Sequence, residues 1–410
     1  MSVTTDKTDE MGEAGEADEV GAAVEWRNPK LWDLAGAWRG AGVAVAILAV
    51  TRIGQMIMLL WLGAVANDGT SLRGRLLVWD AGWFLKVAAN GYPHGYSYGD
   101  GHRLVGNGLA FFPLYPTLIR GGSALGFDAG TAAISVSWLA SIGLAIALHL
   151  LGTSLYGRRV GWALVAICCS APVSIVFSMA YSESLFLALV AGMLVAAHRK
   201  VWWAAGLLGL GAALTRPTGL AAALALAVAA LLAVRDARRS GDRGGVWKPL
   251  VAAAVALAGV PGFLGWVGWR VGDPNAWFKI QSTGWGTSFD FGASTVSFLT
   301  RTLSSDDGWV PMSVALILLA ALAAAGVALV GRPWLPLAVY GLTAMILVYG
   351  QAGFYHSKPR LLVPVLLTLL PAAVAAARAR PRVAVLSIGA WALFGLWYGA
   401  YLVVVWPYTL

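Results

Sequence analysis

Long apolar runs recur along nearly the whole chain and are separated by short polar turns. We predict eleven of them as membrane-spanning helices, because each approaches the roughly 20 residues that a helix needs to cross a bilayer. The predicted spans are residues 41–66, 132–155, 161–178, 184–197, 202–215, 219–234, 250–269, 312–330, 334–349, 361–377 and 383–405. The pattern therefore predicts an all-α polytopic membrane protein.

The distribution of basic residues orients these spans and decides a twelfth, ambiguous run. Residues 235–248 carry five cationic side chains and are predicted as a cytoplasmic loop, because Lys and Arg are enriched in cytoplasmic loops. Successive spans cross the membrane in alternating directions. Counted back from this loop, they place the N-terminus inside only if the short, Pro-interrupted run at 111–126 does not cross the membrane. We therefore expect juxtamembrane helices in the first extracytoplasmic loop, 67–128, a second long outer loop at 271–310, and an outer C-terminus.

Composition and charge narrow the class of protein further. The chain is 59% hydrophobic and 12% charged, against about 25% charged residues in soluble domains. We assign its net charge of +9 to cytoplasmic Lys and Arg, not to nucleic-acid binding. Cys168 and Cys169 are adjacent and predict neither a disulfide nor a metal site. Residues 1–25 are acidic and polar and are predicted to be a disordered cytoplasmic tail before a single membrane domain, 26–410.

The unusual polar residues gather at the predicted outer ends of the spans. A transporter would bury such groups near the middle of the membrane. Arg52 is the only clear charge inside a predicted span, and the sequence assigns it no role. This placement favours chemistry at the lipid–water boundary over transport.

The stretch VWDAGWFLKVAANGY, residues 78–92, places an aspartate at that boundary. We predict a helix over 81–90 that ends at Gly91, with one apolar face lying on the bilayer. Asp80 fits the N-cap position of this helix. It also fits a general base that takes a proton from an acceptor hydroxyl.

Further candidate groups lie beside other predicted spans. Glu183 begins an apolar helix, where an acid favours the helix dipole, and it would also support Asp80 or orient a sugar. Arg216 in TRPTG, with Lys358 and Arg360 in HSKPR, match phosphate oxygens, and snorkelling at the interface is the alternative. Phosphate contact is favoured for Arg360, because it enters a predicted span. The candidate substrate-binding aromatic residues are Trp79, Trp83, Tyr92 and Tyr181.

Several of these stretches together resemble the PIG-V mannosyltransferases. WDAGWFLKVAANGY followed by NGLAFFPLYP resembles the luminal loop of that family, and MAYSESLFLAL, LTRPTGL and KPRLLVPVLLTLLP resemble its later motifs. The resemblance implies a GT-C fold and a polyprenyl-phosphate sugar donor used on the extracytoplasmic side. Asp80 matches the W-D aspartate of the family, Glu183 its Y-[ST]-E glutamate and Arg216 the arginine of its R-x-x-G turn.

The resulting hypothesis is a cell-membrane mannosyltransferase. It would transfer mannose, with inversion, from polyprenyl-phosphate-mannose to a lipid- or envelope-linked acceptor. Asp80 would be the base, and Glu183 would support it. The donor phosphate would be bound by Arg216, Arg360 and Lys358. No metal or other cofactor is expected, because no D-x-D or E-D pair lies near Asp80. The alternatives are a transporter or flippase of lipid-linked sugars and an inactive GT-C scaffold. The hypothesis requires Asp80, Glu183 and Arg216 to meet in one cavity.

Overall fold

The chain folds almost entirely into helices. The computed structural model describes residues 34–241, 245–305 and 307–408, so the predicted tail at 1–25 lies outside the described residues. The helices are α1 (Leu34–Ala66), α2 (Leu72–Leu76), α3 (Asp80–Asn90), α4 (Leu114–Ala124), α5 (Ala129–Tyr156), α6 (Arg158–Cys169), α7 (Glu183–His198), α8 (Trp202–Ala213), α9 (Gly219–Arg239), α10 (Trp247–Val271), α11 (Ala276–Trp285), α12 (Ala293–Ser304), α13 (Trp309–Val330), α14 (Leu335–Tyr349), α15 (Lys358–Leu362), α16 (Leu366–Arg378) and α17 (Pro381–Val404). Short 3-10 turns lie at Asp100–His102, Gly108–Ala110, Ser174–Phe177 and Tyr355–Ser357, and a two-stranded hairpin joins β1 (Ser97–Tyr98) to β2 (Leu104–Val105).

The long helices confirm the prediction of an all-α polytopic membrane protein. In the described part of the chain, six helices are long and apolar enough to cross a membrane: α1, α5, α9, α10, α13 and α17. A seventh span is formed if Tyr355–Leu362 and α16 count as one, although they bend by 57° at a break. The remaining apolar helices α7, α8 and α14 are shorter. These lengths do not establish the predicted number of eleven spans.

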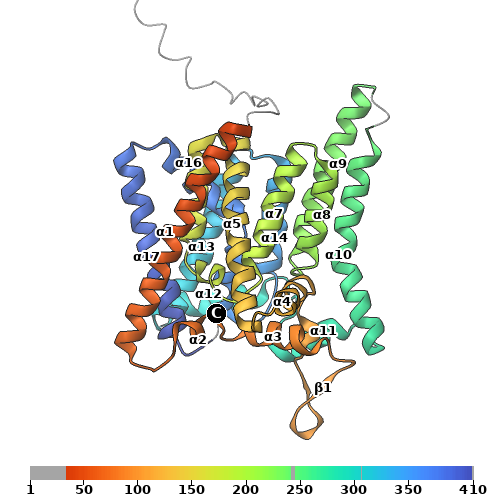
Figure 1. Ribbon diagram of the computed structural model, residues 1–410, viewed down its shortest axis with the longest axis vertical. Helices are drawn as coiled ribbons and strands as arrows, with labels where there is room; N and C mark the ends of the chain where they lie inside the picture. The colour runs from red at the N-terminus through yellow and green to blue at the C-terminus, as the bar shows by residue number, and fades with distance from the viewer. Residues whose placement is uncertain (1–33, 242–244, 306, 409–410) are drawn as a thin grey trace, which may run out of the picture. The chain divides into compact units, whose positions relative to one another are not determined.

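Short helices from both predicted outer loops gather at one end of this bundle. α2, α3 and α11 lie at that end together with the β-hairpin (Figure 1). α4 has 11 residues, which corresponds to about 16 Å of helix and is too short for a hydrocarbon layer of about 30 Å. The run at 111–126 thus forms a short helix, in agreement with the expectation that it does not cross.

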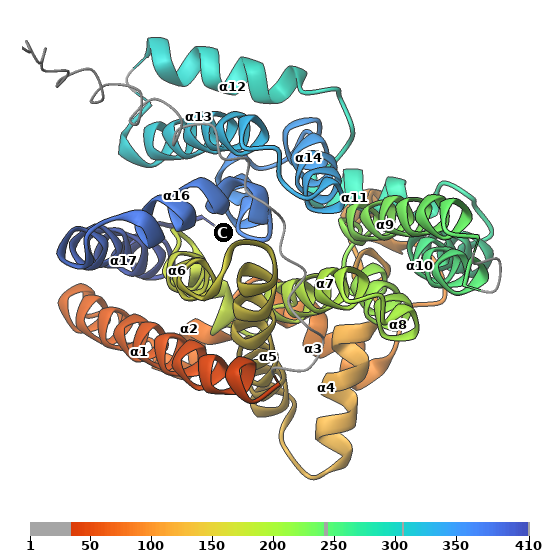
Figure 2. The same cartoon turned by 90° about the horizontal axis from the view of Figure 1, so that it is seen from above.

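α7 is the helix that carries the candidate Glu183 into the interior. Seen along the bundle, it lies among α5, α8 and α9 (Figure 2), and it contacts all three. Most of its side chains are buried. Because it is apolar nearly all round, it behaves as a core helix, and its first residue is fixed in position by the surrounding helices.

The predicted span at 161–178 is not one continuous helix. α6 ends at Cys169, and residues 170–182 follow as an irregular, buried segment before α7 begins. Pro172 lacks a backbone N–H, and Val173 has a φ of 69°, a left-handed conformation that a helix cannot accommodate. Apolar composition predicted a span here because it does not distinguish a buried helix from a buried irregular segment.

Arg52 of α1 stabilises this irregular segment. Its Nη1 donates to the carbonyl oxygen of Ser174 at 2.8 Å and to Oγ of Ser178 at 3.1 Å, and its Nη2 donates to the carbonyl oxygen of Cys169. Non-helical backbone at membrane depth is tolerated only where other protein groups satisfy its polar atoms. The charge inside the first span therefore caps the end of α6 and the turn that follows.

Replacing Arg52 by Met should destabilise the fold. The change leaves two buried carbonyl oxygens without donors, at a cost of about 1–3 kcal/mol each. Thermal unfolding of the detergent-solubilised protein measures this loss. Arg120→Met, at an exposed position on α4, is the matched control and should unfold like the wild type. Equal melting temperatures for the two variants would contradict this role for Arg52.

Candidate active site

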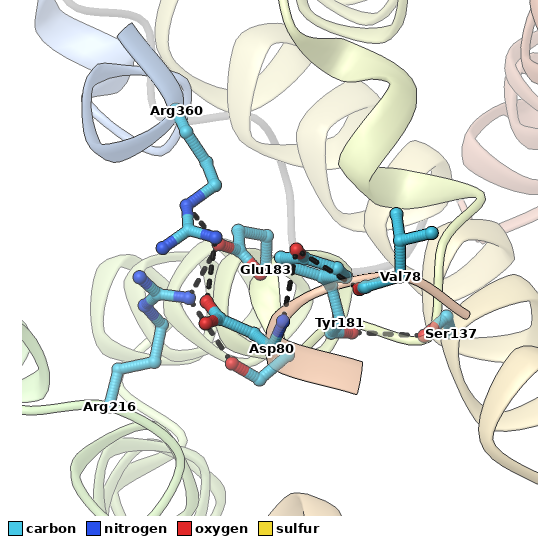
Figure 3. A network of polar contacts seen from close by, with 8 residues as sticks. Val78, Asp80, Ser137, Tyr181, Glu183, Arg216 and Arg360 are labelled. Carbon is cyan, nitrogen blue, oxygen red and sulfur yellow. Dashed lines mark hydrogen bonds and ion pairs between the residues drawn. The ribbon is translucent and has the colours of Figure 1, made fainter. Parts of the chain in front are cut away.

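Four charged side chains from distant parts of the chain meet in one network (Figure 3). Asp80 begins α3, Glu183 begins α7, Arg216 lies in the turn between α8 and α9, and Arg360 lies in α15. Nη1 of Arg360 is 2.7 Å from Oδ2 of Asp80, and its Nε is 3.4 Å from Oε1 of Glu183. Nη1 of Arg216 is 2.7 Å from the same Glu183 oxygen. Glu183 therefore links both arginines, and Arg360 links both acids.

The backbone before α3 turns the Asp80 carboxylate toward Arg360. Trp79 has φ 57° and ψ −113°, a conformation that residues other than glycine rarely adopt. Trp79 is the N-cap, Asp80 is the first helical residue, and no side chain caps the helix start. The expectation that Asp80 begins the helix holds, but its carboxylate forms an ion pair instead of an N-cap hydrogen bond.

Tyr181 holds the start of α3 against the network. Its hydroxyl accepts from the backbone N–H of Asp80 at 3.4 Å and donates to the carbonyl oxygen of Val78 at 3.5 Å. The Arg360 guanidinium lies 5.2 Å from the centre of its ring. Burial, together with the Asp80 charge, raises the pKa of Tyr181 well above its usual value, so the hydroxyl stays protonated.

The network is buried, and its formal charges cancel. The side chain of Glu183 is 1% exposed, whereas those of Arg360, Arg216 and Asp80 are 12%, 14% and 21% exposed. Charges removed from water need partners, so each member depends on the others. Asp80 is the more accessible of the two acids and is the one that a substrate can reach.

A cavity of about 440 Å³ adjoins this network. Asp80, Arg216, Arg360 and Lys358 line it, whereas Glu183 lies behind them. Lys358 is nonetheless 3% exposed, and its Nζ donates to the carbonyl oxygens of Val348 and Gln351 at 2.8 and 2.7 Å. The structure therefore brings Asp80, Glu183, Arg216 and Arg360 together. The Lys358 ammonium is instead hydrogen-bonded to the backbone at the end of α14.

The four aromatic residues selected from the sequence do not line this cavity. Trp79 and Tyr181 hold the start of α3, as described above. Trp83 stacks on Phe111, with ring centres 6.1 Å apart, and Tyr92 donates from its hydroxyl to the Phe111 carbonyl oxygen at 2.8 Å. Trp83 and Tyr92 therefore support Phe111, which lines the cavity, and are not placed to contact a substrate there directly.

Sequence reasoning missed the aromatic residues that do line the cavity. They come from α3, from the segment before α4, from α11, from the loop that follows it and from the segment before α15: Phe84, Phe111, Phe112, Trp277, Phe278, Trp285, Phe289 and Phe354. The long outer loop at 271–310 is rich in aromatic residues, which was the available signal. No motif or periodicity indicated which of them would face the site.

Comparison with known proteins finds a family model that matches part of the chain. Residues 61–232 match the family model described as Mannosyltransferase (PIG-V). Over 169 residues, the chain is 31% identical to GPI alpha-1,6-mannosyltransferase 2 of Rattus norvegicus. That alignment covers 38% of this chain and 32% of the rat protein, so the chain matches about a third of the length of this curated relative.

One solved structure is similar over most of the chain. It is the crystal structure of ArnT from Cupriavidus metallidurans bound to undecaprenyl phosphate, with 16% sequence identity and a TM-score of 0.49. The match covers 87% of this chain and 63% of that chain.

The predicted resemblance to the PIG-V mannosyltransferases is confirmed over residues 61–232. Asp80, Glu183 and Arg216 lie inside that stretch, whereas Lys358 and Arg360 lie beyond it. Arg360 lies outside the family match, but in the structure it contacts both acids that lie inside it.

A double-mutant cycle measures how strongly the buried network couples. We expect Glu183→Gln and Arg216→Gln to lower stability individually, and the double variant to lose less than their sum by about 1–3 kcal/mol. Glu183→Gln leaves Arg216 without an acidic partner, and Arg216→Gln leaves the buried Glu183 with Arg360 alone. The matched pair Arg235 and Asp236 is more than half exposed and should couple by less than about 1 kcal/mol. Additive losses at Glu183 and Arg216 would show that the network contributes no coupling.

Proposed function

We propose that this protein is an integral-membrane glycosyltransferase that moves mannose from a polyprenyl-phosphate-mannose donor to a lipid- or envelope-linked acceptor. One observation carries the proposal: the Asp80 carboxylate and the guanidinium groups of Arg216 and Arg360 line the same cavity. A base and a cationic phosphate site are the two groups that such a transfer requires. The PIG-V match supports mannose as the sugar.

The proposed reaction is a single displacement. Asp80 takes the proton of the acceptor hydroxyl. At the same time, the oxygen of that hydroxyl forms a bond to the anomeric carbon of mannose. The bond from that carbon to the phosphate oxygen breaks, and the polyprenyl phosphate leaves with the bonding electrons. Attack opposite the leaving group inverts the anomeric centre. Arg216 and Arg360 stabilise the charge that develops on the phosphate, and Glu183 holds both arginines in place.

The cavity also offers a place for the prenyl chain. Beside the arginines it is lined by Leu220 of α9, Val260 and Leu264 of α10 and Leu347 of α14. These helices supply the apolar surface that a polyprenyl tail needs next to its phosphate. The charge bias of the sequence supports a cytoplasmic N-terminus, which would put this end of the bundle on the extracytoplasmic face.

The proposed transferase explains the buried charges better than a transporter does. A transporter is expected to line a mid-membrane path with polar groups. Arg52, the charge inside α1, is instead 3% exposed and engaged with backbone carbonyls and serines. An inactive scaffold would keep the same geometry, so an activity measurement distinguishes it.

Asp80→Asn is the direct test of the proposed base. The purified protein is incubated with polyprenyl-phosphate-mannose and membrane lipid extract, and the mannosylated product is identified by mass spectrometry. We expect the variant to lose about 10²–10⁴-fold in rate, because the amide does not accept the hydroxyl proton. Asp100→Asn, on the exposed turn of the β-hairpin, is the matched control and should keep wild-type activity. Wild-type rates in Asp80→Asn would refute the assignment.

We further propose that transfer needs no divalent metal ion. Each acid of the network already faces a guanidinium group, and no cluster of three or more His, Cys, Asp or Glu able to hold a metal occurs among the residues that the structure describes. We expect the initial rate to stay the same after treatment with EDTA. Loss of activity that added Mn²⁺ or Mg²⁺ restores would reverse this proposal.

A further inference from the structure

The cavity has two chemically different walls. Asp80, Arg216 and Arg360 form a charged wall. Phe84, Phe111 and Trp285 form a second wall, which is aromatic. All three charged residues have an assigned role in the proposed reaction, whereas the aromatic wall has none.

The aromatic wall starts at the proposed base. Phe84 lies one helical turn after Asp80 on α3, and residues four apart share a helix face. The ring of Phe111 meets that of Phe84 at 4.9 Å and that of Trp285 at 5.3 Å, both edge to face. Trp83, behind the wall, meets Trp285 at 5.7 Å. A continuous aromatic surface therefore leads away from Asp80.

Contacts between distant segments fix Trp285 in this wall. Gly106 and Gly284 approach so closely that a Cβ on either would lie 2.7 Å from the Cα of the other, so only glycine fits at this contact. Gln281 of α11 donates from Nε2 to the Ala110 carbonyl oxygen at 3.1 Å. α11 is thus docked against the segment that carries Phe111.

An ion pair next to α11 also ties it to the first loop. Oδ2 of Asp273 accepts from the hydroxyl of Tyr96 and from Nζ of Lys279, both at 2.6 Å. These hydrogen bonds lower the pKa of Asp273 to about 2, so its carboxylate is ionised at neutral pH. The wall is therefore built before any ligand arrives, which lowers the entropy cost of binding.

We propose that this aromatic wall is the acceptor subsite, where Trp285 and Phe111 lie against the C–H face of a hydroxylated ring. The inference rests on the proposed function. In-line displacement puts the acceptor opposite the departing phosphate, and Asp80, which pairs with Arg360, shares a face of α3 with Phe84. An aromatic face fits the C–H surface of a ring, while Thr287 and Ser288, which also line the cavity, pair with its hydroxyls.

Binding of alkyl glycosides tests this subsite without requiring activity. Octyl mannoside, octyl glucoside and octyl galactoside, each radiolabelled, are equilibrated with the protein in nanodiscs. We expect Trp285→Leu to weaken binding of the best of them about tenfold, because an aliphatic side chain provides no aromatic face. Trp285→Phe keeps a ring and should restore most of the affinity.

A remote tryptophan and a second assay separate the outcomes. Trp269→Leu, on α10 and 78% exposed, is outside the cavity and should bind like the wild type. In the transfer assay, Trp285→Leu should raise the KM for the acceptor, whereas Trp269→Leu should keep the wild-type KM. Wild-type binding in folded Trp285→Leu, or no specific binding of any glycoside, overturns the acceptor subsite. Absence of transfer in the wild type overturns the proposed function instead.

Discussion

The structure depends on a buried network of ion pairs between two acids and two arginines. Glu183 is almost inaccessible to solvent and pairs with Arg216 and Arg360. A carboxylate in such a place is tolerated only with close cationic partners. The three segments that carry these residues must therefore pack together, and Arg360 adds α3 by pairing with Asp80. The same constraint that holds the helices in place puts the proposed base beside the two arginines proposed to bind phosphate.

Each member of the network lies where a helix is interrupted. Asp80 and Glu183 are first helical residues, Arg216 is in a turn, and Arg360 lies in a short helix before a bend of 57°. Such breaks let polar groups enter an apolar bundle, because backbone that leaves a helix is held by specific partners. Arg52 satisfies the backbone of the irregular segment between α6 and α7, and Tyr181 fixes the start of α3. The strained Trp79 belongs to the same set of adjustments.

Sequence patterns predicted the parts of the site that depend on isolated charges beside apolar runs. Asp80, Glu183, Arg216 and Arg360 all stood out in this way. Lys358 stood out too, but it lies two residues before Arg360, and residues two apart on a helix point to different sides. Its ammonium therefore binds backbone carbonyl oxygens instead of joining the network. The aromatic wall was not predictable, because Trp285 reaches the cavity through a contact between Gly106 and Gly284, which are far apart in the sequence. Apolar content alone also hid the break after α6.

The central claim is that Arg216 and Arg360 receive the phosphate of a lipid donor beside the Asp80 carboxylate. A cryo-electron microscopy structure of the purified protein in nanodiscs with polyprenyl phosphate tests it most directly. The account predicts phosphate density within hydrogen-bonding distance of both guanidinium groups, with the prenyl chain running along α9, α10 and α14. Phosphate density elsewhere in the protein, with the two arginines still closed on Glu183 and Asp80, would contradict it.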